Sequence, residues 1–374
     1  MASLSKGPAG IRAMNNFAFM IHPIEPKTDV SRRFPLLGKL PAGVINHFSR
    51  FFPPVQLSHI VGIRSEATGK EIEGWLFACP LTPKRMFELR LPVSYKKIIQ
   101  TGRLAERRGA RILGLGAFTS VIGDAGLTIS EALSIPVTTG NSFTVALAVE
   151  ASLKAARCME LELSQSVAAV VGAYGSIGRA CTRLLARSVP NLMLVGQSME
   201  RLQKVREEIG STVAKTTVTT QLDALRQADI VVAVTSSLTP IIEPDHLKPG
   251  SVVCDVARPR NVSRRVVERR DDVLVFEGGV VQLPGDVDFG FDFGLPPGQA
   301  YACMAETMLL ALEGRYECYS VGRNIDLERV DEIAQLAANH GFCLTGFRSF
   351  ERTLTGSEID GIRERAYQRR RLAS

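Results

Sequence analysis

Long apolar runs and an N-terminal apolar segment are both absent from this sequence. No apolar run among the 374 residues reaches the roughly 18 residues that a membrane-spanning helix needs. Residues 1–16 carry charges but no apolar core of signal-peptide length. We therefore expect a cytoplasmic protein without a transmembrane segment.

Paired cysteines are absent as well. The seven cysteines are scattered, and none forms a Cys-x-x-Cys pair. This spacing argues against a disulfide framework and against a zinc site, so we expect no metal. Each thiol is in the first place a small apolar side chain, although one of them can be a nucleophile.

Positive charge is abundant, but no nucleic-acid motif accompanies it. The net charge is +7, and arginines gather at residues 258–270 and 369–371. These arginines can belong to solvated faces, or they can attract cofactor phosphates, coenzyme A or an acidic carrier protein. Without a recognisable motif we expect no nucleic-acid partner.

A glycine-rich turn stands between an apolar run at residues 167–171 and a helical pattern that follows it. In a strand–turn–helix unit of this kind, the glycines permit a tight turn, close approach to a pyrophosphate, and close packing of helix on strand. The helix N-terminus then faces the phosphates. The alternative is an ordinary tight turn. We expect a dinucleotide to contact Gly172, Tyr174, Gly175, Ser176, Ile177 and Gly178.

The residues at the end of the next predicted strand, residues 192–195, indicate which dinucleotide the chain binds. An NAD site usually has an acidic residue here to bind the ribose 2′-hydroxyl. This sequence has Gln197 and Ser198, with Arg201 three residues further on. Small polar groups and an arginine suit a 2′-phosphate, so we predict NADPH. The alternative is that Arg201 only caps a solvated helix.

Further strands predicted at residues 229–234, 251–256 and 272–276 alternate with helices. This order predicts an α/β fold with a Rossmann-type doubly wound parallel sheet. Loops after such strands face the ligand, so Thr235 and Ser236 are candidate cofactor contacts. The Gly278–Gly279 pair can let the backbone approach a nicotinamide, or it can be a simple turn.

The rest of the chain predicts a second α/β unit. A hairpin is expected around Thr68-Gly69, and no regular element is predicted at residues 17–55. A helix capped by Asn141 or Ser142 would join the two units. We expect a flexible leader at 1–16, an N-terminal α/β substrate domain at 17–142, a Rossmann NADP-binding domain with its linking helix at 143–298, and a C-terminal helical segment with a basic tail at 299–374.

Cys303 lies near the start of a predicted helix over residues 298–314, in what we expect to be its second turn. A helix N-terminus favours a thiolate, but the effect fades beyond the first turn. From the residues alone, Cys303 can be a structural thiol or a nucleophile.

Several motifs together resemble the long-chain acyl-[acyl-carrier-protein] reductases of cyanobacteria, a resemblance that covers roughly residues 55–345. The resembling stretches are residues 115–120 (LGAFTS), 138–141 (TTGN), 171–178 (VGAYGSIG), 277–281 (EGGVV), 301–310 (YACMAETMLL) and 320–324 (SVGRN).

The resemblance implies that a fatty acyl thioester is reduced to a fatty aldehyde with NADPH. It implies that Cys303 takes the acyl group as an enzyme-bound thioester. Asn141 is expected among the cofactor contacts. Candidate donors to the oxyanion are the Asn141 amide and backbone N–H groups near Gly278 and Gly279. The implied partner is an acyl carrier protein or a coenzyme A thioester, with contact to a membrane surface or to an aldehyde-consuming enzyme as a further expectation.

Two alternatives stay open at this point. One is a shikimate- or amino-acid-dehydrogenase-like NADP oxidoreductase in which Cys303 is structural. The other is a regulator that binds NADPH without catalysis.

Overall fold

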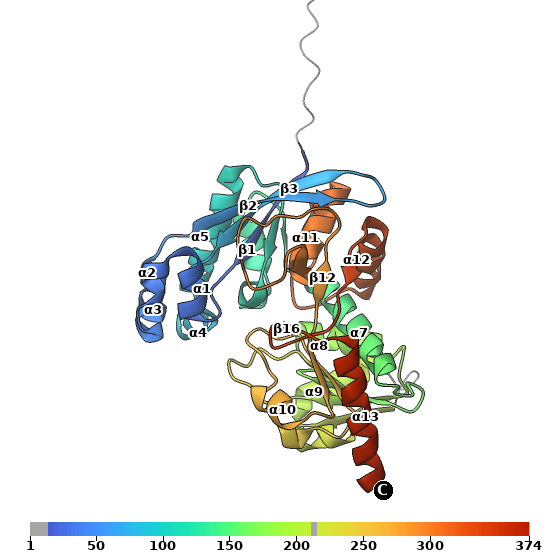
Figure 1. The fold of residues 1–374 in the computed structure, drawn as a ribbon. Coiled ribbons are helices and arrows are strands. Elements are labelled where there is room, and N and C mark those ends of the chain that lie inside the picture. Colours follow the sequence, from blue (N-terminus) through green and yellow to red (C-terminus); the bar gives the residue numbers. More distant parts are fainter. Residues whose placement is uncertain (1–13, 211–214, 374) are drawn as a thin grey trace, which may run out of the picture.

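The computed structural model describes residues 14–210 and 215–373, and Figure 1 shows two α/β bodies, one above the other, with helix α7 (Asn141–Cys158) between them. Most of the expected leader, residues 1–16, lies outside the described residues. Its last residue, Asn16, is already the first residue of strand β1 (Asn16–Ile21). Within residues 14–210 and 215–373, no helix has both the length and the apolar character that a membrane span requires.

The first body is built on a five-stranded sheet in the order β2-β3-β1-β4-β5. Strands β2 (Val55–Arg64) and β3 (Glu71–Ala78) form the predicted antiparallel hairpin. β1 pairs in parallel with β3 and with β4 (Leu113–Leu115), and β4 pairs in parallel with β5 (Val137–Thr138).

The expectation that residues 17–55 hold no regular element was wrong. They contain the central strand β1 and several short helices. Four successive residues of β1 are buried, so the strand lacks the alternation of polar and apolar residues that marks a half-exposed strand. Prolines break the following residues into short helices. The helices and 3₁₀ segments of this body are α1 (Pro26–Arg33), α2 (Pro35–Gly38), α3 (Ala42–Phe48), η1 (Ser49–Phe51), α4 (Pro83–Glu88), α5 (Leu91–Arg108), η2 (Ala117–Ser120) and α6 (Leu127–Ala132).

The second body is the predicted doubly wound parallel sheet. Its strand order is β11-β10-β9-β6-β7-β8, which is the 3-2-1-4-5-6 order of a Rossmann fold when counted from β6. Its strands are β6 (Val167–Val171), β7 (Asn191–Val195), β8 (Lys215–Thr219), β9 (Ile230–Ala233), β10 (Val252–Asp255) and β11 (Leu274–Glu277). Its helices and 3₁₀ segments are α8 (Ser176–Leu185), α9 (Met199–Ile209), η3 (Leu222–Gln227), η4 (Pro244–His246) and α10 (Arg264–Arg269).

The last part of the chain returns to both bodies. Helix α11 (Ala302–Glu313) packs against β1, β4 and α7, and α12 (Leu327–His340) packs against α7. Helix α13 (Gly356–Ala373) lies along the Rossmann body (Figure 1) and places Ile359 and Ala366 in its core. The remaining strands are β12 (Val280–Gln282), β13 (Gln299–Tyr301), β14 (Cys343–Leu344), β15 (Arg348–Ser349) and β16 (Arg352–Thr353).

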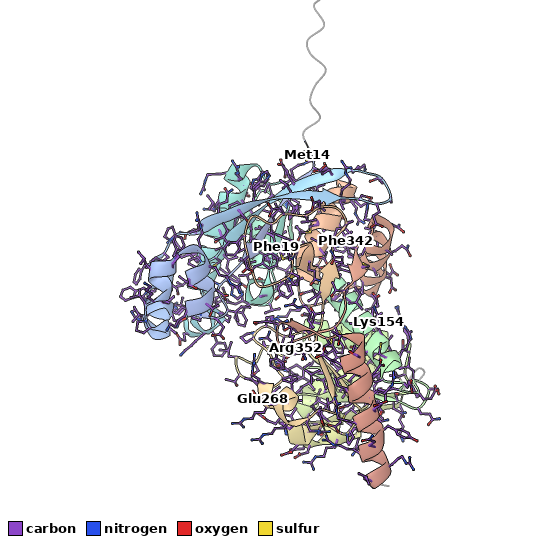
Figure 2. All side chains as sticks on the ribbon, viewed as in Figure 1. Met14, Phe19, Lys154, Glu268, Phe342 and Arg352 are labelled. Atoms are coloured by element: carbon purple, nitrogen blue, oxygen red, sulfur yellow. The ribbon has the colours of Figure 1, made fainter. Side chains whose placement is uncertain are left out.

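The core of the first body extends into the C-terminal segment. Phe19 of β1 and Phe342, both labelled in Figure 2, belong to one buried cluster together with residues of α11. The domain boundaries drawn from the sequence stay a prediction, but α11 is an integral layer of the first body. Cys303 is therefore held by the N-terminal half of the chain.

Candidate active site

The glycine turn between β6 and α8 has the geometry that a pyrophosphate cradle requires. Gly172 adopts a φ of 94°, in the left-handed region that favours glycine. A Cβ added to Gly178 would lie 2.2 Å from the carbonyl oxygen of Gly172, so the helix packs here only with glycine. At Gly175 a Cβ would meet only that same oxygen, at 3.2 Å, which leaves room over the N-terminus of α8. These residues fit a dinucleotide.

The residues after β7 line the same cleft. Gln197 and Arg201 face it, and the Arg201 guanidinium lies 5.6 Å from the centre of the Tyr174 ring. Ser198 is used differently, because its hydroxyl accepts the Arg201 backbone N–H at 3.4 Å and caps α9. An arginine on an aromatic ring at this strand end suits a 2′-phosphate.

The cleft lies between the two bodies and encloses about 2110 Å³. This exceeds the roughly 300–1,000 Å³ of ordinary small-molecule pockets. All the predicted site residues line it except Gly178, which packs the turn, and Ser198. Apolar side chains line the end formed by the first body, including Phe19, Ile21, Ile45, Phe52, Leu57, Phe291 and Phe293.

Cys303 lies in the first turn of α11, so the expectation that it falls in the second turn was wrong. Tyr301 is the N-cap and Ala302 the first helical residue. The thiol is half-buried and lines the cleft. This position brings it within reach of the helix N-terminus.

The Cys303 thiol is nonetheless a weak acid. Burial raises its pKa to about 12, and the Glu306 carboxyl contributes to the increase. Hydrogen bonds from the backbone N–H groups of Ala117 and Met304 lower the pKa. These donors stabilise negative charge on the sulfur once it forms.

The loop that carries Ala117 is held in an unusual conformation. Ala117 has a φ of 46°, which a residue other than glycine rarely adopts. The next N–H, that of Phe118, donates to His22 Nε2 at 2.9 Å, and His22 Nδ1 lies 3.3 Å from the Pro23 carbonyl oxygen. This pattern assigns the His22 proton to Nδ1. Burial lowers the pKa of His22 to about 4, so the ring is neutral and fixes the loop beside Cys303.

The N-termini of α7 and α11 meet at Gly140. The N-cap of α7 is Gly140, so the expectation that Asn141 or Ser142 caps this helix was wrong. A Cβ on Gly140 would lie 2.2 Å from Cys303 Cα, and the φ of Gly140 is 72°. Asn141 lines the cleft, and its buried amide nitrogen has no hydrogen-bond partner among the residues that the structure describes. It is an available donor beside Cys303.

Glu306 holds these two helices together. This carboxylate is fully buried, and it accepts the Phe143 backbone N–H at 2.9 Å and the Ser320 hydroxyl at 2.7 Å. The Thr138 hydroxyl also donates to it. Burial raises the pKa of Glu306. This network fixes the loop before α7 against the turn that carries Cys303.

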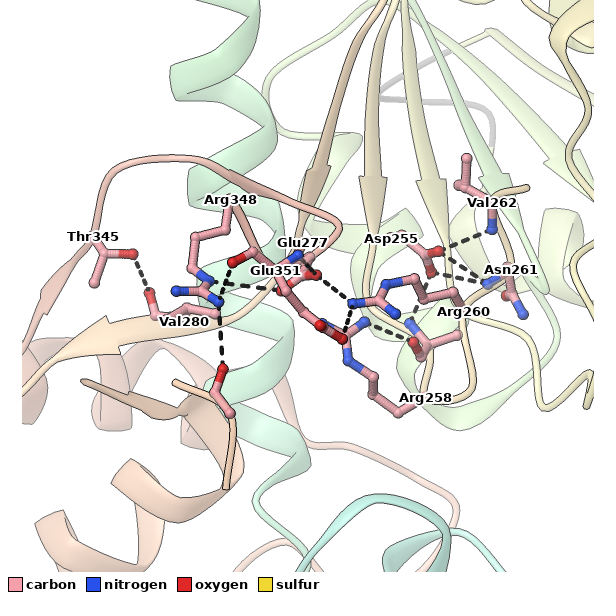
Figure 3. A network of polar contacts seen from close by, with 12 residues as sticks. Asp255, Arg258, Arg260, Asn261, Val262, Glu277, Val280, Thr345, Arg348 and Glu351 are labelled. Atoms are coloured by element: carbon pink, nitrogen blue, oxygen red, sulfur yellow. Dashed lines mark hydrogen bonds and ion pairs between the residues drawn. The ribbon is translucent and has the colours of Figure 1, made fainter. Parts of the chain in front are cut away.

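A second polar network lies at the end of β11, next to Gly278 and Gly279 (Figure 3). Glu277, at the end of β11, pairs with Arg258 at 3.2 Å and with Arg260 at 2.7 Å. Burial favours a higher pKa for Glu277, but these arginines outweigh it and hold the pKa below its usual value. The Glu351 backbone N–H also donates to Glu277, at 3.1 Å. Part of the arginine-rich segment thus serves the fold itself.

Sequence reasoning missed His22, Ala117 and Glu306. Glu306 could have been found, since it is the one charged residue inside the mostly apolar sequence of α11, whose other charge, Glu313, is the last residue of the helix. Ala117 lies within a stretch singled out for its resemblance, but nothing local indicates its backbone conformation. His22 had no sequence signal, because its role depends on contacts with a distant loop.

Comparison with known proteins identifies the family. Residues 154–277 match the model of the Shikimate / quinate 5-dehydrogenase family, which covers most of the Rossmann body. One relative is the long-chain acyl-[acyl-carrier-protein] reductase of Synechococcus elongatus (strain ATCC 33912 / PCC 7942 / FACHB-805). The two sequences are 30% identical over 334 residues, and the match covers 85% of this chain and 95% of the relative. The chain belongs to the long-chain acyl-[acyl-carrier-protein] reductase family. Membership and the Rossmann body together identify an oxidoreductase that uses a nicotinamide dinucleotide.

The chain is also similar to other known proteins. Aminotransferase PigE of Serratia sp. (strain ATCC 39006) is 34% identical over 303 residues, 79% of this chain, and the chain spans 34% of the length of PigE. Among solved structures, L-tryptophan dehydrogenase from Nostoc punctiforme has a TM-score of 0.39 at 13% identity and covers 95% of this chain and 89% of its own. Shikimate 5-dehydrogenase from Listeria monocytogenes has a TM-score of 0.36 at 12% identity. The match covers 88% of this chain and 99% of the dehydrogenase chain.

Proposed function

We propose that this chain reduces a long-chain fatty acyl thioester to the fatty aldehyde with NADPH, through an acyl thioester on Cys303. The observation that carries the proposal is that the Cys303 sulfur and the glycine turn after β6 open into one cleft. A reductant held at the turn and an acyl group held on the sulfur would then face the same space. The acyl donor is a thioester of an acyl carrier protein or of coenzyme A.

In the first half-reaction the Cys303 sulfur attacks the thioester carbonyl carbon. A bond forms between that carbon and the sulfur, the bond to the donor thiol breaks, and the proton lost by Cys303 balances the proton gained by the departing thiol. N–H groups of Ala117 and Met304 stabilise the attacking sulfur. The product is again a thioester, so the carbonyl carbon stays reactive.

Gly172, Gly175 and the N-terminus of α8 would hold the pyrophosphate of NADPH, Gln197 and Arg201 its 2′-phosphate, and Gly278 and Gly279 its nicotinamide. When bound, NADPH would supply the hydride that an acyl carbonyl needs to become an aldehyde. The chain's own part is to bind and orient. The free Asn141 amide is the donor that we assign to the oxyanion. When the carbon–sulfur bond breaks, the sulfur keeps the electron pair, and a proton from solvent restores the Cys303 thiol.

The apolar end of the cleft suits the acyl chain. Its phenylalanine and aliphatic side chains suit an alkyl chain, and polar side chains such as Asp29, Arg32 and Ser49 line the same end in smaller number. The Shikimate / quinate 5-dehydrogenase match ends at residue 277 and leaves out both this lining and Cys303. The fatty acyl thioester is therefore the substrate that we favour over a polar one.

The proposal is tested by trapping the acyl group. The protein is incubated with a long-chain acyl-coenzyme A in the absence of NADPH, and its intact mass and peptide map are measured. We expect one acyl adduct, on Cys303, and none in Cys303→Ala. Cys343→Ala, which removes an exposed thiol, is the matched control and should retain the adduct. Full aldehyde production by Cys303→Ala would overturn the proposal.

A further inference from the structure

Apolar side chains gather on one exposed face of the first body. Among the described residues, eleven of the seventeen large apolar side chains that are exposed lie between residues 34 and 93, and ten of these, all except Val61 of β2, lie at residues 34–52 and 87–93. The most exposed are Leu36 at 77%, Phe87 at 74% and Phe51 at 62%. Isolated exposed apolar residues are ordinary, but a group of this kind marks an interaction surface. We name this group the phenylalanine face, and its members are Phe34, Leu36, Leu40, Val44, Phe48, Phe51, Phe52, Phe87, Leu91 and Val93.

The phenylalanine face belongs to one group of elements. It is carried by α2, α3, η1, α4 and the start of α5, which lie together with α1 at the edge of the first body (Figure 1). The Thr82 hydroxyl donates to the Asn46 side chain and ties α4 to α3. The Lys97 ammonium donates to the Phe52 carbonyl oxygen at 2.9 Å and ties α5 to η1. The face is thus a constructed surface and not a frayed segment.

Positive charge surrounds this face. Residues 25–52 and 83–97 contain ten Lys or Arg residues against three Asp or Glu residues. Arg50 lies 4.4 Å from the ring centre of Phe51, and Arg33 lies 5.8 Å from that of Phe34. Aromatic and aliphatic side chains among basic residues are typical of protein surfaces that enter the headgroup region of an anionic bilayer.

The same helices also wall the cleft from within. Val30, Leu37 and Ile45 line the cleft, and so do three members of the phenylalanine face: Phe34, Phe52 and Phe87. An apolar molecule leaving the cleft past these helices would emerge at that face. A second copy of the chain is a poor occupant, because two such basic surfaces repel each other.

We propose that the phenylalanine face docks on an anionic membrane surface, with its apolar side chains among the headgroups and its Lys and Arg residues against the lipid phosphates. This docking stands on the exposed side chains alone. Delivery of a water-insoluble aldehyde into the bilayer is a consequence that rests, in addition, on the proposed function.

Docking is measured by flotation of the purified full chain with phosphatidylcholine vesicles, with and without phosphatidylglycerol, in the absence of substrate and NADPH. We expect binding to the phosphatidylglycerol vesicles that weakens as salt is raised. The double variant Phe48→Ser/Phe51→Ser should bind about ten-fold more weakly or worse. Because both side chains are exposed, its thermal unfolding should match that of the unsubstituted chain.

The matched control is Tyr367→Ser/Leu372→Ser on α13, which removes two exposed apolar side chains at 62% and 88% exposure from the other body. It should bind vesicles like the unsubstituted chain. Equal loss in both double variants, or no binding to phosphatidylglycerol vesicles, overturns the proposal. The proposal is also overturned if the phenylalanine face binds a purified acyl carrier protein, or forms dimers in solution, but does not bind vesicles. Since Cys303→Ala should still float, failure of the chemistry and failure of docking are distinguishable.

Discussion

Cys303 combines a raised pKa with donors that favour its charged form. Because the pKa is raised to about 12, the reactive thiolate is scarce at neutral pH and grows with pH throughout the accessible range. We expect the rate of Cys303 alkylation or acylation to rise about ten-fold per pH unit up to about pH 9. The measurement is the rate of thiol loss by mass spectrometry. A plateau at neutral pH would mean that the resting thiol is already ionised.

His22 links the stability of the site to pH. Its pKa falls from 6.5 in the unfolded chain to about 4 in the folded one, so the unfolded chain binds the proton more readily between these values. The contribution of neutral His22 to the free energy of unfolding is therefore fully present above about pH 6.5. It is lost as the pH falls toward 4, which lowers the free energy of unfolding by about 3 kcal/mol in all. Denaturant unfolding of the unsubstituted chain and of His22→Gln, compared across this range, measures it. The variant should show a shallower loss, and identical slopes would refute the assignment.

Arg201 bears on the choice of cofactor. If its guanidinium holds a 2′-phosphate, Arg201→Ala should raise the KM for NADPH about ten-fold and leave the KM for NADH unchanged. Arg206→Ala is a control on the same helix, at a residue outside the cleft lining. Equal effects on both cofactors would show that Arg201 does not read the phosphate.

At the scale of the elements, the contact between the N-termini of α7 and α11 sets the site. Gly140→Ala would force a Cβ to within 2.2 Å of Cys303 Cα. Gly109→Ala, at the end of α5, has a similar left-handed φ of 90° but open space around its Cβ. Gly109→Ala should lower the free energy of unfolding by about 1 kcal/mol, from backbone strain alone. Gly140→Ala should lower it by at least about 2 kcal/mol more, because the added Cβ also clashes. Thermal unfolding compares them, and equal losses would mean that the close contact does not matter.

The elements that could be predicted from sequence are those with local signals. Strand β6, the glycine turn and α8 follow from adjacent residues, and so do α9 and the β2–β3 hairpin. Strand β1 could not be predicted, because a strand buried on both faces loses its alternation. The surroundings of Cys303 could not be predicted either, since Ala117, Gly140 and Glu306 meet only through packing between distant segments. Sequence reasoning could nominate the thiol but not Ala117 and Met304, whose backbone N–H groups donate to the sulfur.

At the scale of the whole molecule, two bodies enclose one cleft. The Rossmann body contributes the glycine turn, and the first body contributes the apolar wall and, through α11, the thiol. The phenylalanine face extends that apolar wall to the outside. The arrangement suits a reaction whose substrate arrives on a carrier and whose product is a water-insoluble chain.

The central claim is that Cys303 carries the acyl group that is reduced. The most direct measurement is a single-turnover chase: the acylated protein is isolated from excess acyl-coenzyme A, NADPH is added, and aldehyde and remaining adduct are followed together. We expect the Cys303 adduct to disappear as an equal amount of fatty aldehyde appears. An adduct that persists, or that leaves as free fatty acid, while the unsubstituted chain makes aldehyde in steady state would contradict it.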